Sequence, residues 1–144
     1  MTIYGLQANH LVAPLGFALE SLSLSWKVKD AAGKKQTAAQ VIITNAANGK
    51  VLHDSGLRED IDSLSYVPGI VLAPRTRYAW CVRVTTDAGE DETSAWTGFE
   101  TGKMDEAWQA KWITPDEKHV NTRMFRSFPL RNLLFLLRIH VFDI

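Results

Sequence analysis

The chain has 144 residues, of which 46% are hydrophobic and 22% charged, values typical of a globular protein with enough apolar material for a packed core. Its 16 basic and 16 acidic residues give a formal net charge of zero, so no global field attracts it to nucleic acid or to an anionic membrane. The single cysteine, Cys81, excludes an internal disulfide and a multi-cysteine zinc site. We expect one domain, with length left for part of a second, and no cofactor, metal, nucleic-acid or membrane partner.

The N-terminus has no basic region followed by a long apolar run, so no signal peptide is visible and a cytoplasmic location is expected. No stretch reaches the roughly 18 uninterrupted apolar residues that a membrane helix needs.

Short alternating segments follow one another through the first hundred residues, separated by Gly, Pro, Asn and Asp, and this pattern is typical of an all-β sandwich. Strands are predicted at residues 4–12, 22–28, 37–44, 51–54, 65–67, 78–84 and 94–101. Gly33 and the pair Asn48-Gly49 mark two of the turns between them. About seven antiparallel strands in roughly a hundred residues is the size of an immunoglobulin-like sandwich.

The strand at 78–84 alternates most regularly and places four apolar residues on one face: Tyr78, Trp80, Val82 and Val84. The segment at 22–28 alternates in the same way, with Trp26 among its apolar residues. In 94–101, Trp96 and Phe99 are the large apolar residues. We expect the aromatic residues from Trp26 through Trp96 to fill the space between two layers of strands.

The spacing of Leu72, Pro74, Thr76 and Tyr78 resembles the Leu-x-Pro-x-Thr-x-Tyr pattern of fibronectin type III domains. The resemblance implies a tyrosine corner, in which Tyr78 buries its ring while its hydroxyl finds a backbone partner. Trp26 lies where such domains carry a core tryptophan on their second strand.

Six further segments occur in the order seen in the N-terminal module of bacterial α-L-rhamnosidases. They are Ser-Trp at 25–26, Gln-Thr-Ala-Ala-Gln at 36–40, Asp-Ser-Gly at 54–56, Tyr-Ala-Trp-Cys-Val-Arg-Val at 78–84, Ser-Ala-Trp at 94–96 and Phe-Glu-Thr-Gly at 99–102. Trp-Gln-Ala-Lys-Trp-Ile at 108–113 is similar to the junction with the next β-domain of that family. The resemblance covers roughly the first 115 residues. It implies a non-catalytic accessory domain, because the family's catalytic unit, a helical (α/α)-barrel that hydrolyses terminal α-L-rhamnose with inversion, lies far downstream.

We therefore predict a fibronectin-type-III-like β-sandwich at 1–102, a linker at 103–115, and at 116–144 either the truncated start of a second β-domain or an aberrant tail, out of frame with the parent. The apolar run at 133–137 lacks its partners in this chain. We expect it to be disordered, to fold back on the sandwich, or to pair with another copy.

An inverting glycosidase needs a raised-pKa acid and a carboxylate base on opposite sides of the scissile bond. The acids here cluster in two turns instead: Asp54, Glu59, Asp60 and Asp62 in one, and Asp87, Glu90, Asp91 and Glu92 in the other. We expect ordinary pKa values and a solubilising role for them. The histidines, His10, His53, His119 and His140, have no metal-ligand spacing. No catalytic residue, cofactor site or metal site is predicted.

Trp96, Trp108 and Trp112 leave two interpretations open. Flat aromatic side chains are platforms for sugar stacking, but packing in the core or at a domain junction is favoured. The leading hypothesis is an accessory module that packs against neighbouring domains of a parent rhamnosidase, orienting its catalytic barrel or bordering its substrate groove. The rival is an independent carbohydrate-binding or adhesion module, and a third possibility is a fragment that folds but has no separable function.

Overall fold

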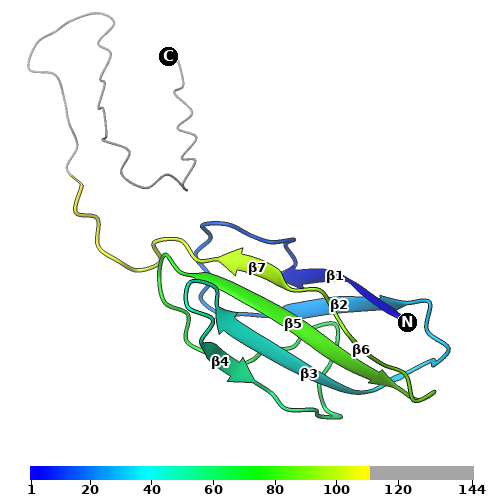
Figure 1. Ribbon diagram of the computed structural model, residues 1–144. Coiled ribbons are helices and arrows are strands. Elements are labelled where there is room, and N and C mark those ends of the chain that lie inside the picture. The colour runs from blue at the N-terminus through cyan, green and yellow to red at the C-terminus, as the bar shows by residue number, and fades with distance from the viewer. Residues whose placement is uncertain (111–144) are drawn as a thin grey trace, which may run out of the picture. The chain divides into compact units, whose positions relative to one another are not determined.

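Two antiparallel β-sheets pack face to face in the part of the chain that the structure, a computed structural model, describes, residues 1–110 (Figure 1). All seven described strands lie in one compact unit, Met1–Ala107. The all-β, immunoglobulin-like sandwich predicted from the alternating segments is therefore confirmed. Residues 111–144 lie outside the described part, and with them Trp112, the apolar run at 133–137 and the predicted second domain.

The smaller sheet pairs β1 (Thr2–Ala8) with β2 (Leu24–Lys29). β1 contains a bulge, because its two residues between Tyr4 and Gln7 lie opposite the single residue Trp26 of β2. Gly5, one of these two residues, has φ +61°. Tyr66 forms a single bridge to Leu24 on the other side of β2, where a brief strand was predicted at 65–67.

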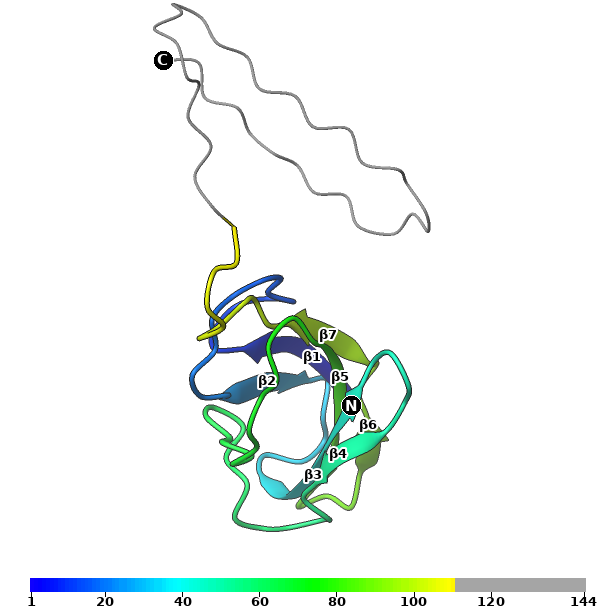
Figure 2. The same ribbon diagram turned by 90° about the vertical axis from the view of Figure 1, so that its left-hand side faces the viewer.

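The larger sheet has the order β4-β3-β5-β6, and β7 also pairs with β5. Its strands are β3 (Gln36–Asn45), β4 (Val51–Asp54), β5 (Arg77–Thr86), β6 (Asp91–Thr93) and β7 (Thr97–Glu100). Because β3 pairs with β5 along nearly its whole length, β6 and β7 follow one another along the opposite edge of β5. Figure 2 shows β1 and β2 facing this sheet across the core.

The core lies between the sheets and is formed by the residues that alternation assigns to the inner faces. Trp26 and Leu24 from the smaller sheet meet Trp80 and Phe99 from the larger one, and each is at most 2% exposed. The predicted inner face of β5 is confirmed, since Tyr78, Trp80, Val82 and Val84 are all buried.

A tyrosine corner closes one end of the sandwich, as the resemblance implied. The Ala73 backbone N–H donates to the Tyr78 hydroxyl over 2.7 Å, and that hydroxyl lies 3.5 Å from the Ala73 carbonyl. The Tyr78 ring stacks on Phe99, with centroids 4.9 Å apart. Thr101 completes the corner, because its hydroxyl donates to the same carbonyl over 2.7 Å.

Two predicted strands differ from those observed. The first ends at Ala8 and not at residue 12, because Asn9 and His10 adopt positive φ and turn the chain. The strand predicted at 94–101 is divided into β6 and β7, because residues 94–96 lie opposite only Cys81 and Val82 of β5. The extra residue makes a bulge, which Ser94 stabilises by accepting the Val82 N–H at its hydroxyl over 3.1 Å.

Candidate functional site

Two acids of the first cluster, Asp54 and Asp60, are held by hydrogen bonds that favour their charged forms. Asp54 accepts from the side-chain amide of Gln40 over 2.7 Å and from the Gly56 N–H over 2.9 Å, and these bonds lower its pKa. Asp60 binds the guanidinium of Arg58 with both carboxylate oxygens, which lowers the pKa of Asp60. Neither carboxyl is a proton donor near neutral pH.

The second cluster follows the same rule. Glu90 accepts from the Gly33 N–H over 3.0 Å, and this bond is the main reason for its lowered pKa. Both carboxylate oxygens of Asp91 accept hydrogen bonds from the guanidinium of Arg83, which lowers the pKa of Asp91. The expectation of ordinary pKa values is thus wrong for Asp54, Asp60, Glu90 and Asp91, and the shift is opposite to the one that an acid catalyst of glycoside hydrolysis needs.

Metal and thiol chemistry are the alternatives to acid catalysis among residues 1–110. No group of three His, Cys, Asp or Glu side chains in this range could hold a metal ion. Cys81 is buried, and burial is the main cause that raises the pKa of its thiol, so the nucleophilic thiolate is disfavoured. Within the same range, no helix has the length and apolarity needed to cross a membrane.

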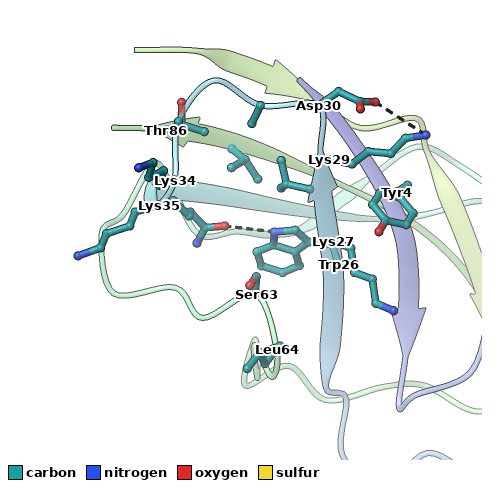
Figure 3. A pocket seen from close by; sticks show the side chains of 15 residues that line it. Tyr4, Trp26, Lys27, Lys29, Asp30, Lys34, Lys35, Ser63, Leu64 and Thr86 are labelled. Carbon is teal, nitrogen blue, oxygen red and sulfur yellow. Dashed lines mark hydrogen bonds and ion pairs between the residues drawn. The ribbon is translucent and has the colours of Figure 1, made fainter. Parts of the chain in front are cut away.

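A hollow of about 590 Å³ lies between β2, the turn that follows it and the segment around Ser63 (Figure 3). Four lysines line it: Lys27, Lys29, Lys34 and Lys35. Asp30 is the only acid among its lining residues, and it lies 3.9 Å from the Lys29 ammonium group. The hollow therefore has no pair of carboxylates for hydrolysis, although its positive rim suits an anion.

Trp26 lines this hollow but offers no platform for a sugar ring. It is only 2% exposed, and its Nε1 donates to the side-chain oxygen of Gln36 over 3.2 Å. Gln36 in turn donates to the Ile61 carbonyl over 2.7 Å, which ties the segment after β4 to the start of β3. Trp26 is a structural residue.

The expectation that Trp96 fills the core is wrong, because its side chain is 55% exposed. Trp96 lies in the break between β6 and β7, outside both strands, whereas Phe99 of β7 occupies the inner face with 0% exposure. Trp108 is 79% exposed, and Trp112 lies outside the described residues.

Residues 9–17, called here the end loop, form a surface at the end of the sandwich that was not predicted from the sequence. Four of its apolar side chains are exposed: Leu11 (40%), Val12 (72%), Leu15 (66%) and Phe17 (48%). Four of its residues have positive φ: Asn9, His10, Ala13 and Gly16. The signal in the sequence is a run of apolar residues interrupted by Pro14 and Gly16, and the strand predicted at 4–12 covers only its beginning.

Backbone hydrogen bonds hold the end loop against β7. The Glu100 N–H donates to the Pro14 carbonyl over 2.8 Å, and the Gly16 N–H donates to the Glu100 carbonyl over 3.0 Å. One step further, the Gly102 N–H donates to the Phe17 carbonyl over 2.7 Å. The loop is therefore a fixed part of the domain, and its exposed side chains do not depend on a mobile backbone.

Known proteins identify the fold and the family. The family model described as the Rha78A-like N-terminal immunoglobulin domain matches residues 3–105. An α-L-rhamnosidase of Streptomyces avermitilis is 43% identical over 114 residues, which are 74% of this chain and 11% of that protein.

Solved structures agree with this assignment. The structure of a Streptomyces avermitilis α-L-rhamnosidase complexed with L-rhamnose matches with a TM-score of 0.66 at 36% identity. The match covers 78% of this chain and 12% of the rhamnosidase chain. The structure of the α-L-rhamnosidase from Dictyoglumus thermophilum matches with a TM-score of 0.67 at 31% identity. This match covers 81% of this chain and 14% of the other chain. The chain thus spans only 11% to 14% of the length of these relatives. It belongs to the family of Rha78A-like N-terminal immunoglobulin domains.

Proposed function

We propose that this chain is the non-catalytic N-terminal accessory domain of an α-L-rhamnosidase, a glycoside hydrolase that releases terminal α-L-rhamnose with inversion. The observation that carries the proposal is where the similarity falls. Residues 3–105 match an N-terminal immunoglobulin domain, and the relatives that contain it are seven to nine times longer than the aligned segment, at 11% to 14% coverage. Chemistry in such a protein belongs to the remaining length.

The side chains of the described domain support this division of labour. Four of its clustered acids, Asp54, Asp60, Glu90 and Asp91, have lowered pKa values, and the residues lining its hollow include a single acid, Asp30. An accessory domain acts instead through its surface, by packing on neighbouring domains and so orienting the catalytic barrel or bordering its substrate groove.

Assays of the 144-residue chain with an aryl α-L-rhamnoside test the proposal. The chain alone should release no aryl alcohol above the buffer rate, and the full-length parent should turn the substrate over. Turnover by the chain itself, retained through repurification and absent from a denatured sample, would overturn the proposal.

A second candidate function, carbohydrate binding, rests on the exposed indole of Trp96. Titration with rhamnose-containing oligosaccharides, followed by tryptophan fluorescence, separates it from the first. If the domain only packs on its neighbours, no saturable change appears. Saturable binding that Trp96→Ala abolishes and Tyr4→Ala, at another exposed aromatic residue, preserves would favour the second function.

A further inference from the structure

The end loop presents apolar side chains to solvent from a backbone that is fixed in an unusual conformation. From Leu11 to Phe17 it contains no charged residue, and its most exposed members are Val12 at 72% and Leu15 at 66%. Ala13 has φ +46°, a region that residues with a Cβ rarely adopt outside special sites. Pro14, the next residue, is buried and its carbonyl accepts from the Glu100 N–H, so this conformation holds the loop against β7 while Val12 and Leu15 remain exposed.

The end loop lies beside the point where the chain leaves the sandwich (Figure 1). A Cβ on Gly102 would come within 2.4 Å of the Gly16 carbonyl oxygen, so the two backbones are in direct contact. Arg75 fixes the exit from the other side, because its N–H donates to the Gly102 carbonyl over 2.8 Å and its Nε lies 2.9 Å from a carboxylate oxygen of Glu106.

We propose that the end loop is the docking surface for the folded part of the parent enzyme that lies downstream of this chain. The inference rests on the proposed function. In relatives of which this chain covers 11% to 14%, almost all of the remaining protein follows an N-terminal domain and is attached at its exit. The surface nearest that exit is the one that the attached protein reaches at the highest effective concentration.

The chemistry of the end loop defines the matching face of its partner. That face is apolar opposite Val12 and Leu15, because burying a charge against them without a partner would cost more than it gains. Polar groups belong at the rim, where Arg75 and Glu106 form an exposed ion pair. An apolar centre with a polar rim is the usual composition of a protein interface.

The test introduces a charge into the loop of the full-length parent enzyme, with a matched leucine elsewhere as control. Leu15→Asp and Val12→Asp place a carboxylate in the proposed interface. Leu64→Asp makes the same change at a leucine that is 73% exposed and lines the lysine hollow. Limited proteolysis reports docking through the rate of cleavage between this domain and the rest of the enzyme.

We expect cleavage at least about tenfold faster in Leu15→Asp and Val12→Asp than in the parent, since 1.4 kcal/mol of lost docking free energy is a factor of ten in the undocked population. Leu64→Asp should be cleaved at the parental rate. The same three substitutions in the 144-residue chain should leave its urea midpoint within experimental error, which shows that the domain itself still folds. Cleavage at the parental rate in both loop variants would overturn the inference.

Two further results would also overturn it. If the 144-residue chain is a dimer that Leu15→Asp dissociates, while cleavage of the parent is unchanged, the loop binds a second copy. A second such result would show that the loop binds sugar. In it, all variants are cleaved at the same rate without oligosaccharide, but added oligosaccharide slows cleavage of the loop variants less than that of Leu64→Asp. The proposed function fails separately, through rhamnosidase activity of the 144-residue chain.

Discussion

The middle of the sandwich and its end loop use apolar residues in opposite ways. Along β3 and β5, valine, isoleucine and tryptophan occupy the inner face, and Val41, Val82 and Trp80 are 0% exposed. In the end loop, Val12 and Leu15 are apolar and more than half exposed, although backbone hydrogen bonds join the loop to β7.

The difference separates residues that the fold requires from residues that a partner requires. Burying the inner face of β5 removes apolar surface from water and stabilises the domain by itself. Exposing Val12 gains nothing of that kind, and a non-glycine residue at positive φ costs about 1 kcal/mol or more. The proposed docking interface accounts for both the exposed apolar side chains and the positive φ values of the end loop, which lies at the chain's exit.

Truncating the same residue type in both regions should have very different effects on stability. Val82→Ala removes two buried methyl groups and leaves a cavity, so it should lower the free energy of unfolding of the 144-residue chain by about 2 kcal/mol. Val12→Ala should change it by less than about 0.5 kcal/mol, because the side chain is already in water. Urea denaturation measures both, and equal losses would remove the distinction between the two regions.

The tyrosine corner gives a smaller effect and sharpens the assignment of the inner face. Tyr78→Phe keeps the ring but leaves the Ala73 N–H without the acceptor that lies 2.7 Å away, which should cost about 1–2 kcal/mol. Thr101 still satisfies the Ala73 carbonyl. Tyr4→Phe, at an exposed ring, is the control and should lie within about 0.5 kcal/mol of the parent. A cost no greater than that of the control would show that the hydroxyl adds nothing to the corner.

The smallest expected effect concerns His53, whose ring nitrogen Nε2 lies 2.8 Å from the Tyr66 hydroxyl and so links β4 to the segment that bridges β2. Burial lowers the pKa of His53 below its usual 6.5, and Asp54 opposes the shift. The folded state thus favours the neutral ring, and its contribution to stability is complete above pH 6.5 and is lost as the pH falls toward the lower folded value.

Chemical denaturation at pH 7.5 and pH 5.5 measures this effect. The parent should lose more stability on acidification than His53→Gln, which cannot titrate there. Identical losses in the two proteins would assign the pH dependence to the carboxylates and not to His53.

The sequence predicted the middle of the molecule well because alternation reports burial directly. The strand at 51–54 has the observed bounds, and the strand predicted at 78–84 lies within β5 with the correct inner face. Trp26 and the Tyr78 corner followed from a family pattern whose physical basis is local.

The end of the molecule was not predictable in the same way. Asn9 and His10, with positive φ, form a tight turn that Ala8 and Leu11 close with two backbone hydrogen bonds. Pro14 and Gly16, in contrast, bond to Glu100, a distant partner that no local pattern reports. Trp96 is a different case, since it lies in the break between β6 and β7, outside both strands. The tryptophan was assigned to the core by its residue type.

Replacing four acids of this domain in the full-length parent tests whether the domain contributes surface and not chemistry. The variant carries Asp54→Asn, Asp60→Asn, Glu90→Gln and Asp91→Asn, and kcat is measured on an aryl α-L-rhamnoside. We predict a kcat within about twofold of the parent, because hydrogen bonds from other groups of this domain favour the ionised form of each of these carboxylates. A fall of about a hundredfold or more with the fold intact, the loss expected for a general acid or base, would contradict the claim.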